Sequence, residues 1–164
     1  MTIDNLIQKD IEISGYIYRA FNHRFRKALG VLTHLGDGAL WGVLYFLFLF
    51  VIKPHVITLI HKIILGEFIG LLIIILLRYV TRRNRPDKDY RSTIPWNHYS
   101  FPSHHTFRVF YISFVAGTYY PSIFSILLFC SCVVALSRIC LLKHFLTDVL
   151  GGIIISVVMA KVLT

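Results

Sequence analysis

The sequence predicts an all-α integral membrane protein, a bundle of about five transmembrane helices preceded by an amphipathic interfacial helix. Of the 164 residues, 56% are hydrophobic and only 15% are charged, and the mean hydropathy is +0.69. A soluble globular protein needs a more polar surface than this composition supplies. Backbone groups in lipid need internal hydrogen-bond partners, so the apolar runs must be helices. The length suits a single domain, residues 1–164.

The first thirty residues have the periodicity of an amphipathic helix. Apolar residues recur at steps of three, four and seven, and most of the basic residues fall between them. Such a helix is typical of segments that lie in the lipid headgroup layer. We therefore predict an interfacial helix over residues 1–30, with a soluble helix packed on the end of the bundle as the alternative. The apolar positions are Ile7, Ile11, Tyr18, Phe21, Phe25 and Leu29.

Apolar runs farther along the chain are candidate membrane crossings. Several are shorter than the roughly 20 residues that span a bilayer, so we expect their ends to extend into the polar flanks. The second run also carries Lys62 and Glu67. The five runs cover residues 38–52, 56–77, 106–120, 123–136 and 145–163.

Two polar stretches interrupt these runs. The longer, residues 78–101, has the sequence RYVTRRNRPDKDYRSTIPWNHYSF and holds six of the 17 basic residues. The shorter lies around Lys143. An even number of predicted crossings separates the two stretches, so both lie on the same side of the membrane. We expect them to meet there.

His144 and Asp148 lie four residues apart at the start of the last predicted helix. This spacing puts both side chains on one face, where the carboxylate can accept the imidazole Nδ1 proton. Such a bond fixes the tautomer and leaves Nε2 basic, as a histidine nucleophile requires. The alternative is an interfacial histidine beside an acid that the helix dipole favours.

A second pair of histidines precedes the third predicted crossing, in the segment FPSHHTF. The free amides of a helix N-terminus, together with the Ser103 hydroxyl, can bind a phosphate oxyanion. A histidine beside that phosphate can serve as general acid to a leaving group. Serine and histidine are also common at membrane interfaces, which is the alternative for His104 and His105.

Arginines dominate the longer polar stretch. Arg78 and Arg85 are seven residues apart, about two helical turns, and project on one side if the second helix extends. Guanidinium groups suit the non-bridging oxygens of a phosphate. Anchoring to lipid headgroups is the alternative for Arg82, Arg83, Lys88 and Arg91.

Taken together and in this order, three segments resemble the signature of the type 2 phosphatidic acid phosphatase superfamily, membrane lipid phosphatases related to vanadium haloperoxidases. Its K-x6-RP, PSGH and SR-x5-H-x3-D elements correspond here to RYVTRRNRP, PSHH and SRICLLKHFLTD. The last element matches fully. Arg78 stands where lysine is usual, and His104 stands where glycine is usual. Within this superfamily, the sequence most resembles the small bacterial lipid A 1-phosphatases.

The resemblance implies a lipid phosphatase that needs no metal and no cofactor, with active-site segments 78–105 and 137–148. His144 would attack phosphorus and form a phosphohistidine, and Asp148 would orient it. His105 would protonate the departing oxygen and later activate water. The implied phosphate ligands are Arg78, Arg85, Ser103, His104 and Arg138.

The implied substrate is a phosphomonoester or terminal phosphate on a membrane lipid, with lipid A 1-phosphate placed first. Phosphatidylglycerophosphate and undecaprenyl diphosphate are the alternatives within this class. A catalytically silent lipid-binding membrane protein is the alternative from a different class. The presence of His105, His144 and Asp148 favours the enzyme.

The net charge of +9 favours anionic lipid over nucleic acid as partner, because the basic residues border the apolar runs. All basic residues except Lys53, Lys62 and Lys161 fall on the predicted active-site side, so the positive-inside rule predicts a cytoplasmic site. The family implies instead a site that faces the periplasm from the bacterial inner membrane. We adopt the periplasmic orientation because arginines that bind phosphate are not a guide to the side of the membrane on which they lie. A monomer is compatible with this pattern.

The three cysteines, Cys130, Cys132 and Cys140, lie in or beside apolar runs. Cysteine packs like a small hydrophobic residue, so we expect buried, inert thiols with no disulfide and no metal.

Overall fold

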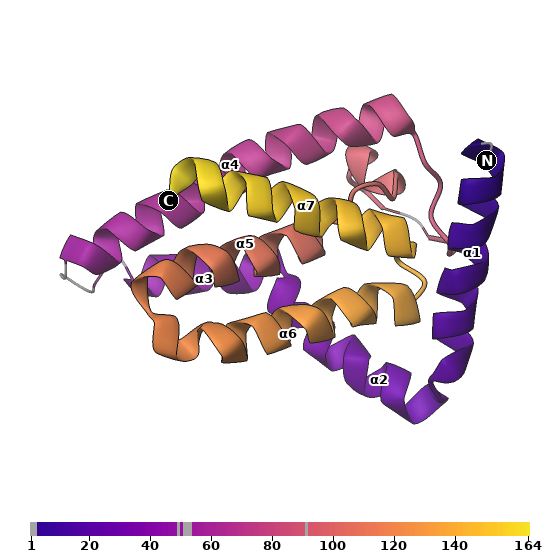
Figure 1. The fold of residues 1–164 in the computed structure, drawn as a ribbon, viewed down its shortest axis with the longest axis horizontal. Helices are drawn as coiled ribbons and strands as arrows, with labels where there is room; N and C mark the ends of the chain where they lie inside the picture. Colours follow the sequence, from indigo (N-terminus) through magenta and orange to yellow (C-terminus); the bar gives the residue numbers. More distant parts are fainter. Residues whose placement is uncertain (1–2, 49, 51–53, 91) are drawn as a thin grey trace.

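The computed structural model describes residues 3–48, 50, 54–90 and 92–164. Within these residues it is helical, which confirms the predicted all-α fold. Figure 1 shows α4, α5, α6 and α7 running along the long axis of the molecule, while α1 crosses one end. The elements are α1 (Ile3–Ala20), α2 (His23–Leu32), η1 (Thr33–Gly36), α3 (Gly38–Phe48), α4 (Pro54–Thr81), η2 (Pro95–His98), α5 (His104–Tyr119), α6 (Pro121–Cys140) and α7 (Leu146–Leu163).

The N-terminal segment forms two helices, whereas the sequence predicted one. Asn22 accepts a hydrogen bond from the Phe25 amide at 2.9 Å and so caps a new helix, α2. Helix α1 turns its buried polar residues, Asp10 and Ser14, toward the bundle. Most of its large apolar residues, among them Ile7 and Ile11, are exposed, while Ile17 packs against the core. This exposed apolar face supports the predicted interfacial location of α1.

Three of the described helices are long and apolar enough to cross a membrane, namely Val56–Thr81, Pro121–Cys140 and Leu146–Leu163. A fourth candidate is a broken span made of His23–Gly36 and Gly38–Phe48, with a bend of 44° between them. The predicted first crossing, residues 38–52, is therefore helical over Gly38–Phe48. Residues 49 and 51–52 of that prediction lie outside the described residues.

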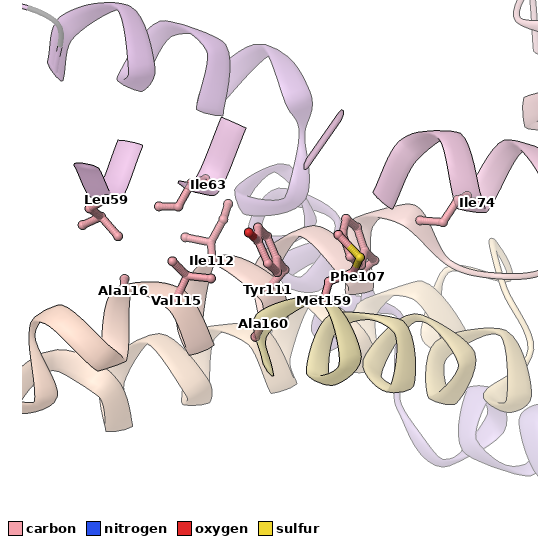
Figure 2. Close-up of a cluster of buried hydrophobic side chains, with 10 residues drawn as sticks. All are labelled: Leu59, Ile63, Ile74, Phe107, Tyr111, Ile112, Val115, Ala116, Met159 and Ala160. Atoms are coloured by element: carbon pink, nitrogen blue, oxygen red, sulfur yellow. The ribbon is translucent and has the colours of Figure 1, made fainter. Parts of the chain in front are cut away.

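Helix α5 is the central helix of the bundle and packs against α4, α6 and α7. It has only 16 residues, fewer than a full span prefers. The main core cluster lies between α5, α4 and α7, and Figure 2 shows Phe107 and Tyr111 of α5 at its centre. Two glycines of α4 permit this close approach, because a Cβ atom on Gly66 would clash with Tyr111 and one on Gly70 with Phe107.

Polar side chains inside the bundle are paired with one another. Arg108 of α5 donates from Nε to Glu67 Oε2 of α4 at 2.5 Å. Ser113 of α5 and Ser131 of α6 share a hydrogen bond of 2.8 Å. These partners explain how the second predicted crossing carries a glutamate, since a buried charge is stable only beside a counter-charge.

Candidate active site

The two polar stretches meet at the end of the bundle that α1 crosses (Figure 1), as the parity of the predicted crossings requires. One of the contacts that join them is between Arg85 Nη1 and His144 Nε2, 3.2 Å apart. Backbone bonds add to it, since the Asp87 amide donates to the Leu142 carbonyl at 3.1 Å.

His144 is 1% exposed and lies in the turn between α6 and α7. The sequence predicted it at the start of the last helix, but α7 begins only at Leu146. Its Nδ1 lies 3.6 Å from Asp148 Oδ2, longer than the predicted hydrogen bond, and has no hydrogen-bond partner in the part of the chain that the structure describes. Burial, followed by the positive charges of Arg85, Arg138 and Arg78, lowers the pKa of His144 well below its usual value. This shift favours the neutral imidazole, which is the form that a nucleophile needs.

Asp148 is fully buried, and both of its carboxylate oxygens have donors. Oδ2 accepts from the Phe145 amide at 2.8 Å. Oδ1 accepts from Arg83 Nη1 at 2.8 Å. The carboxylate is thus held in one orientation beside His144.

Arg78 and Arg85 converge, although not in the way that the sequence predicted. Helix α4 ends at Thr81, so Arg85 lies in the loop and not on an extended helix. Asn97 brings the two together, because its Oδ1 accepts from Arg78 Nη1 and from Arg85 Nη2, each at 3.0 Å. Both guanidinium groups are buried. Burial is the main cause that lowers the pKa of Arg85 from its usual value.

Arg138 projects from the last turn of α6 and is buried. Its Nη1 donates to Thr33 Oγ1 at 2.8 Å. Its Nε has no hydrogen-bond partner among the described residues. A buried guanidinium donor left without an acceptor is a group that an anionic ligand can satisfy.

The three residues at the start of α5 have different surroundings. Ser103 is fully buried, and its Oγ accepts from Thr106 Oγ1 at 3.0 Å, which leaves its own hydroxyl hydrogen for an acceptor. His104 lies beside Arg108, with Nε2 and Nη2 3.4 Å apart. His105 Nε2 contacts Asp37 Oδ1 at 2.8 Å. His105 is also close enough to Arg138 and His144 to interact with both electrostatically.

Several polar residues of this region were not singled out by the sequence. Asn97 and Asp37 belong to none of the three motif segments and stand at no regular spacing from the motif residues, so the sequence offers no signal for them. Arg83 was interpreted as a candidate lipid anchor, but it binds Asp148 and Asp10 instead. Arg82 and Lys88 are exposed and retain that interpretation. Arg91 lies outside the described residues.

Two solved structures resemble this fold. LpxE of Aquifex aeolicus aligns with a TM-score of 0.78 and 24% sequence identity over 92% of this chain and 92% of its own. A transmembrane PAP2-type phosphatidylglycerolphosphate phosphatase of Bacillus subtilis aligns with a TM-score of 0.78 and 20% identity over 97% of this chain and 84% of its own.

No curated protein matches the chain in sequence. The pattern of the PAP2 superfamily matches residues 59–164, a region that contains all of the predicted site residues and most of the chain. The chain therefore belongs to the PAP2 superfamily and is a phosphatase that acts on lipid phosphates.

Proposed function

We propose that the chain hydrolyses a phosphomonoester or terminal phosphate on a membrane lipid through a phosphohistidine at His144, without a metal. The observation that carries this proposal is the 3.2 Å contact between Arg85 Nη1 and His144 Nε2. A guanidinium donor aimed at Nε2 requires an unprotonated nitrogen there. It also puts a phosphate-binding group directly beside the attacking atom.

The reaction takes two steps. In the first, His144 Nε2 forms a bond to phosphorus, the bond from phosphorus to the leaving oxygen breaks, and His105 gives that oxygen a proton. In the second, His105 takes a proton from water, the water oxygen bonds to phosphorus, and the bond to Nε2 breaks. Asp148 orients the imidazole and stabilises its positive charge.

In this proposal the phosphoryl oxygens are held by three arginines close to His144 and by donors at the start of α5. Arg78, Arg85 and Arg138 supply the positive charge, and Ser103 with the His104 amide supplies hydrogen bonds. Phosphoryl transfer needs mostly positioning and charge stabilisation, which these groups provide. The unpartnered Nε of Arg138 supports its share of this role.

We place lipid A 1-phosphate first among the substrates. The signature segments resemble those of lipid A 1-phosphatases, and the likeness to LpxE of Aquifex aeolicus agrees in fold. A polar cleft of about 420 Å³ beside Arg85 also suits a large anionic headgroup. Phosphatidylglycerophosphate is the second candidate, because the Bacillus subtilis phosphatase for that lipid shares the fold. The cleft is lined by Asn84, Arg85, Asp87, Lys88, Tyr90 and His98.

In this proposal residues 1–164 act as one catalytic unit in the bacterial inner membrane, with the site facing the periplasm. The internal bonds of Arg78, Arg83 and Arg138 support the orientation, since charges bound within the fold are not free to set topology.

The test is phosphate release by the purified chain from lipid A, phosphatidylglycerophosphate and undecaprenyl diphosphate in detergent. We expect the highest kcat/KM with lipid A, loss of only the 1-phosphate, full activity in EDTA and inhibition by vanadate, which mimics five-coordinate phosphorus. His144→Ala should fold and bind lipid but release no phosphate. Activity that EDTA abolishes and magnesium restores, or that survives in His144→Ala, would exclude this mechanism. Higher kcat/KM with another lipid would reassign the substrate alone.

A further inference from the structure

Helix α7 carries Asp148 in its first turn, where Oδ2 caps the Phe145 amide but leaves the next amides to other acceptors. Its N-cap residue is Phe145, whose side chain offers no hydrogen-bond acceptor. The first amides of a helix need acceptors from elsewhere. Helix α1 supplies two of them, because Ser14 Oγ accepts from the Leu146 amide at 2.9 Å and Asp10 Oδ1 from the Thr147 amide at 3.1 Å.

These contacts form a joint between α1 and the start of α7. Arg83 connects this joint to the candidate catalytic pair, His144 and Asp148. Its Nη2 donates to Asp10 Oδ2 at 2.5 Å, and its Nη1 donates to Asp148 Oδ1 at 2.8 Å. The same Nη1 contacts Thr147 Oγ1, and the guanidinium plane lies over the Phe145 ring, 4.3 Å from its centroid. One planar cation thus bridges a carboxylate of α1 and a carboxylate of α7, a geometry that a lysine ammonium cannot reproduce.

These contacts matter because the two carboxylates are nearly inaccessible to water. The Asp10 side chain is 4% exposed and that of Asp148 is 0% exposed. A buried carboxylate needs a counter-charge, and a partner removed from such a pair leaves the remaining charge free to shift or to neutralise. Movement of Asp148 by a few tenths of an ångström would change its approach to His144 Nδ1, already 3.6 Å away.

We propose that Asp10 and Arg83 are positioning residues, which hold the start of α7 so that Asp148 faces His144. The proposal rests on the proposed function, because it takes Asp148 as the partner of the nucleophile. It also makes α1 part of the active site. Helix α1 contacts the rest of the bundle through these buried polar groups and through Ile17, while Leu6, Ile7, Ile11 and Ile13 stay exposed for the membrane interface.

The experiment compares Asp10→Asn and Arg83→Lys with two matched controls, Glu12→Gln and Arg82→Lys. Glu12 is an exposed acid on the same helix, and Arg82 is the exposed neighbour of Arg83. The readouts are kcat and KM on one lipid, the thermal midpoint in detergent, and the amount of folded enzyme. We expect both test variants to lower kcat by about 10- to 100-fold with little change in KM, as small displacements of catalytic groups do. The controls should match the unsubstituted chain.

The double variant Asp10→Asn with Arg83→Lys should fall little further than Arg83→Lys alone, because both remove the same bridge. Ser14→Ala is a milder test that leaves every charge in place. It should lower kcat by a few-fold in the same direction, and it serves where a charge variant does not fold.

Two results would overturn the proposal. A raised KM with unchanged kcat would make Arg83 a headgroup ligand. A lower midpoint with unchanged kcat per folded molecule would make the joint purely structural. If the unsubstituted chain releases phosphate from no lipid, or if His144→Ala stays active, the proposed function fails instead. If His144→Ala is inactive but Asp10→Asn and Arg83→Lys keep full kcat, only the positioning role is wrong.

Discussion

Asn97 illustrates how a neutral side chain organises the charges around a phosphate site. Its single Oδ1 accepts from two arginines, and its backbone carbonyl accepts from Arg85 Nε at 3.0 Å. Two guanidinium groups would otherwise repel each other in a buried setting. The amide therefore fixes their spacing before any anion arrives, which is the preorganisation that lowers the cost of binding a transition state.

Arg85→Lys should lower kcat by about 10²- to 10³-fold, roughly 3 kcal/mol of barrier, the amount that one preorganised donor contributes. A lysine nitrogen cannot serve Asn97, Lys143 and the phosphate together, although it keeps the charge. Arg82→Lys should change kcat less than about twofold, because Arg82 is exposed and its Nε contacts only the Tyr79 carbonyl. Steady-state kinetics on one lipid measure both. An equal loss of kcat in the two variants would show that Arg85 does not bind the transferring phosphoryl group.

The residues of the site divide into those that a sequence can indicate and those that it cannot. His144, Asp148 and Arg138 fall at spacings that chemistry constrains, so their motif could be recognised. The partners Asp10 and Asp37 reach the site from 137 and 68 residues away along the chain. No periodicity connects such residues, because packing alone brings them together. The role of Arg83 was misinterpreted for the same reason.

At the scale of the elements, the helices could be located from hydropathy but their ends could not. The second crossing was predicted over residues 56–77, with Arg85 on its face only if the helix extended that far. Helix α4 ends at Thr81, and Arg82 follows with a φ of 46°, a conformation that no apolar pattern indicates. Helix α5 could be predicted as apolar, but its position at the centre of the bundle depends on small residues in α4.

Gly70→Ala should destabilise the bundle, because its Cβ would meet the Phe107 ring where α4 and α5 touch. Overpacking of this kind costs about 1–3 kcal/mol and should lower the thermal midpoint in detergent. Gly42→Ala in α3 is the matched control, since its Cβ would enter open space. It should leave the midpoint unchanged or raise it, because alanine favours a helix over glycine by up to about 1 kcal/mol. A similar midpoint for both variants would contradict the close α4–α5 contact.

For the whole molecule, the distribution of basic residues along the bundle axis conflicts with the proposed orientation, but the conflict shrinks when arginines bound within the fold are not counted. Arg78, Arg83, Arg85 and Arg138 are bound within the site, and Arg108 is paired with Glu67. These five arginines are thus held by contacts within the fold. Nine basic residues remain on the active-site side, against Lys53, Lys62 and Lys161 on the other, so the excess is reduced but keeps its direction.

The proposed orientation predicts which end of the bundle a membrane-impermeant maleimide reaches in intact spheroplasts. In a background without the native cysteines, Asp89→Cys in the active-site loop should react before lysis. Thr164→Cys, which follows α7 at the opposite end, should react only after permeabilisation. Both positions are exposed, so accessibility in the fold does not favour either. The reverse pattern would put the site in the cytoplasm.

The joint between α1 and α7 also sets an order of events during synthesis. Asp10 and Thr147 are 137 residues apart, so α1 is synthesised long before the start of α7. Chains fold from the N-terminus as they emerge, but this contact can form only after residue 147 has emerged. An enzyme whose nucleophile depends on this contact does not act on the surrounding lipids before α7 has packed against α1.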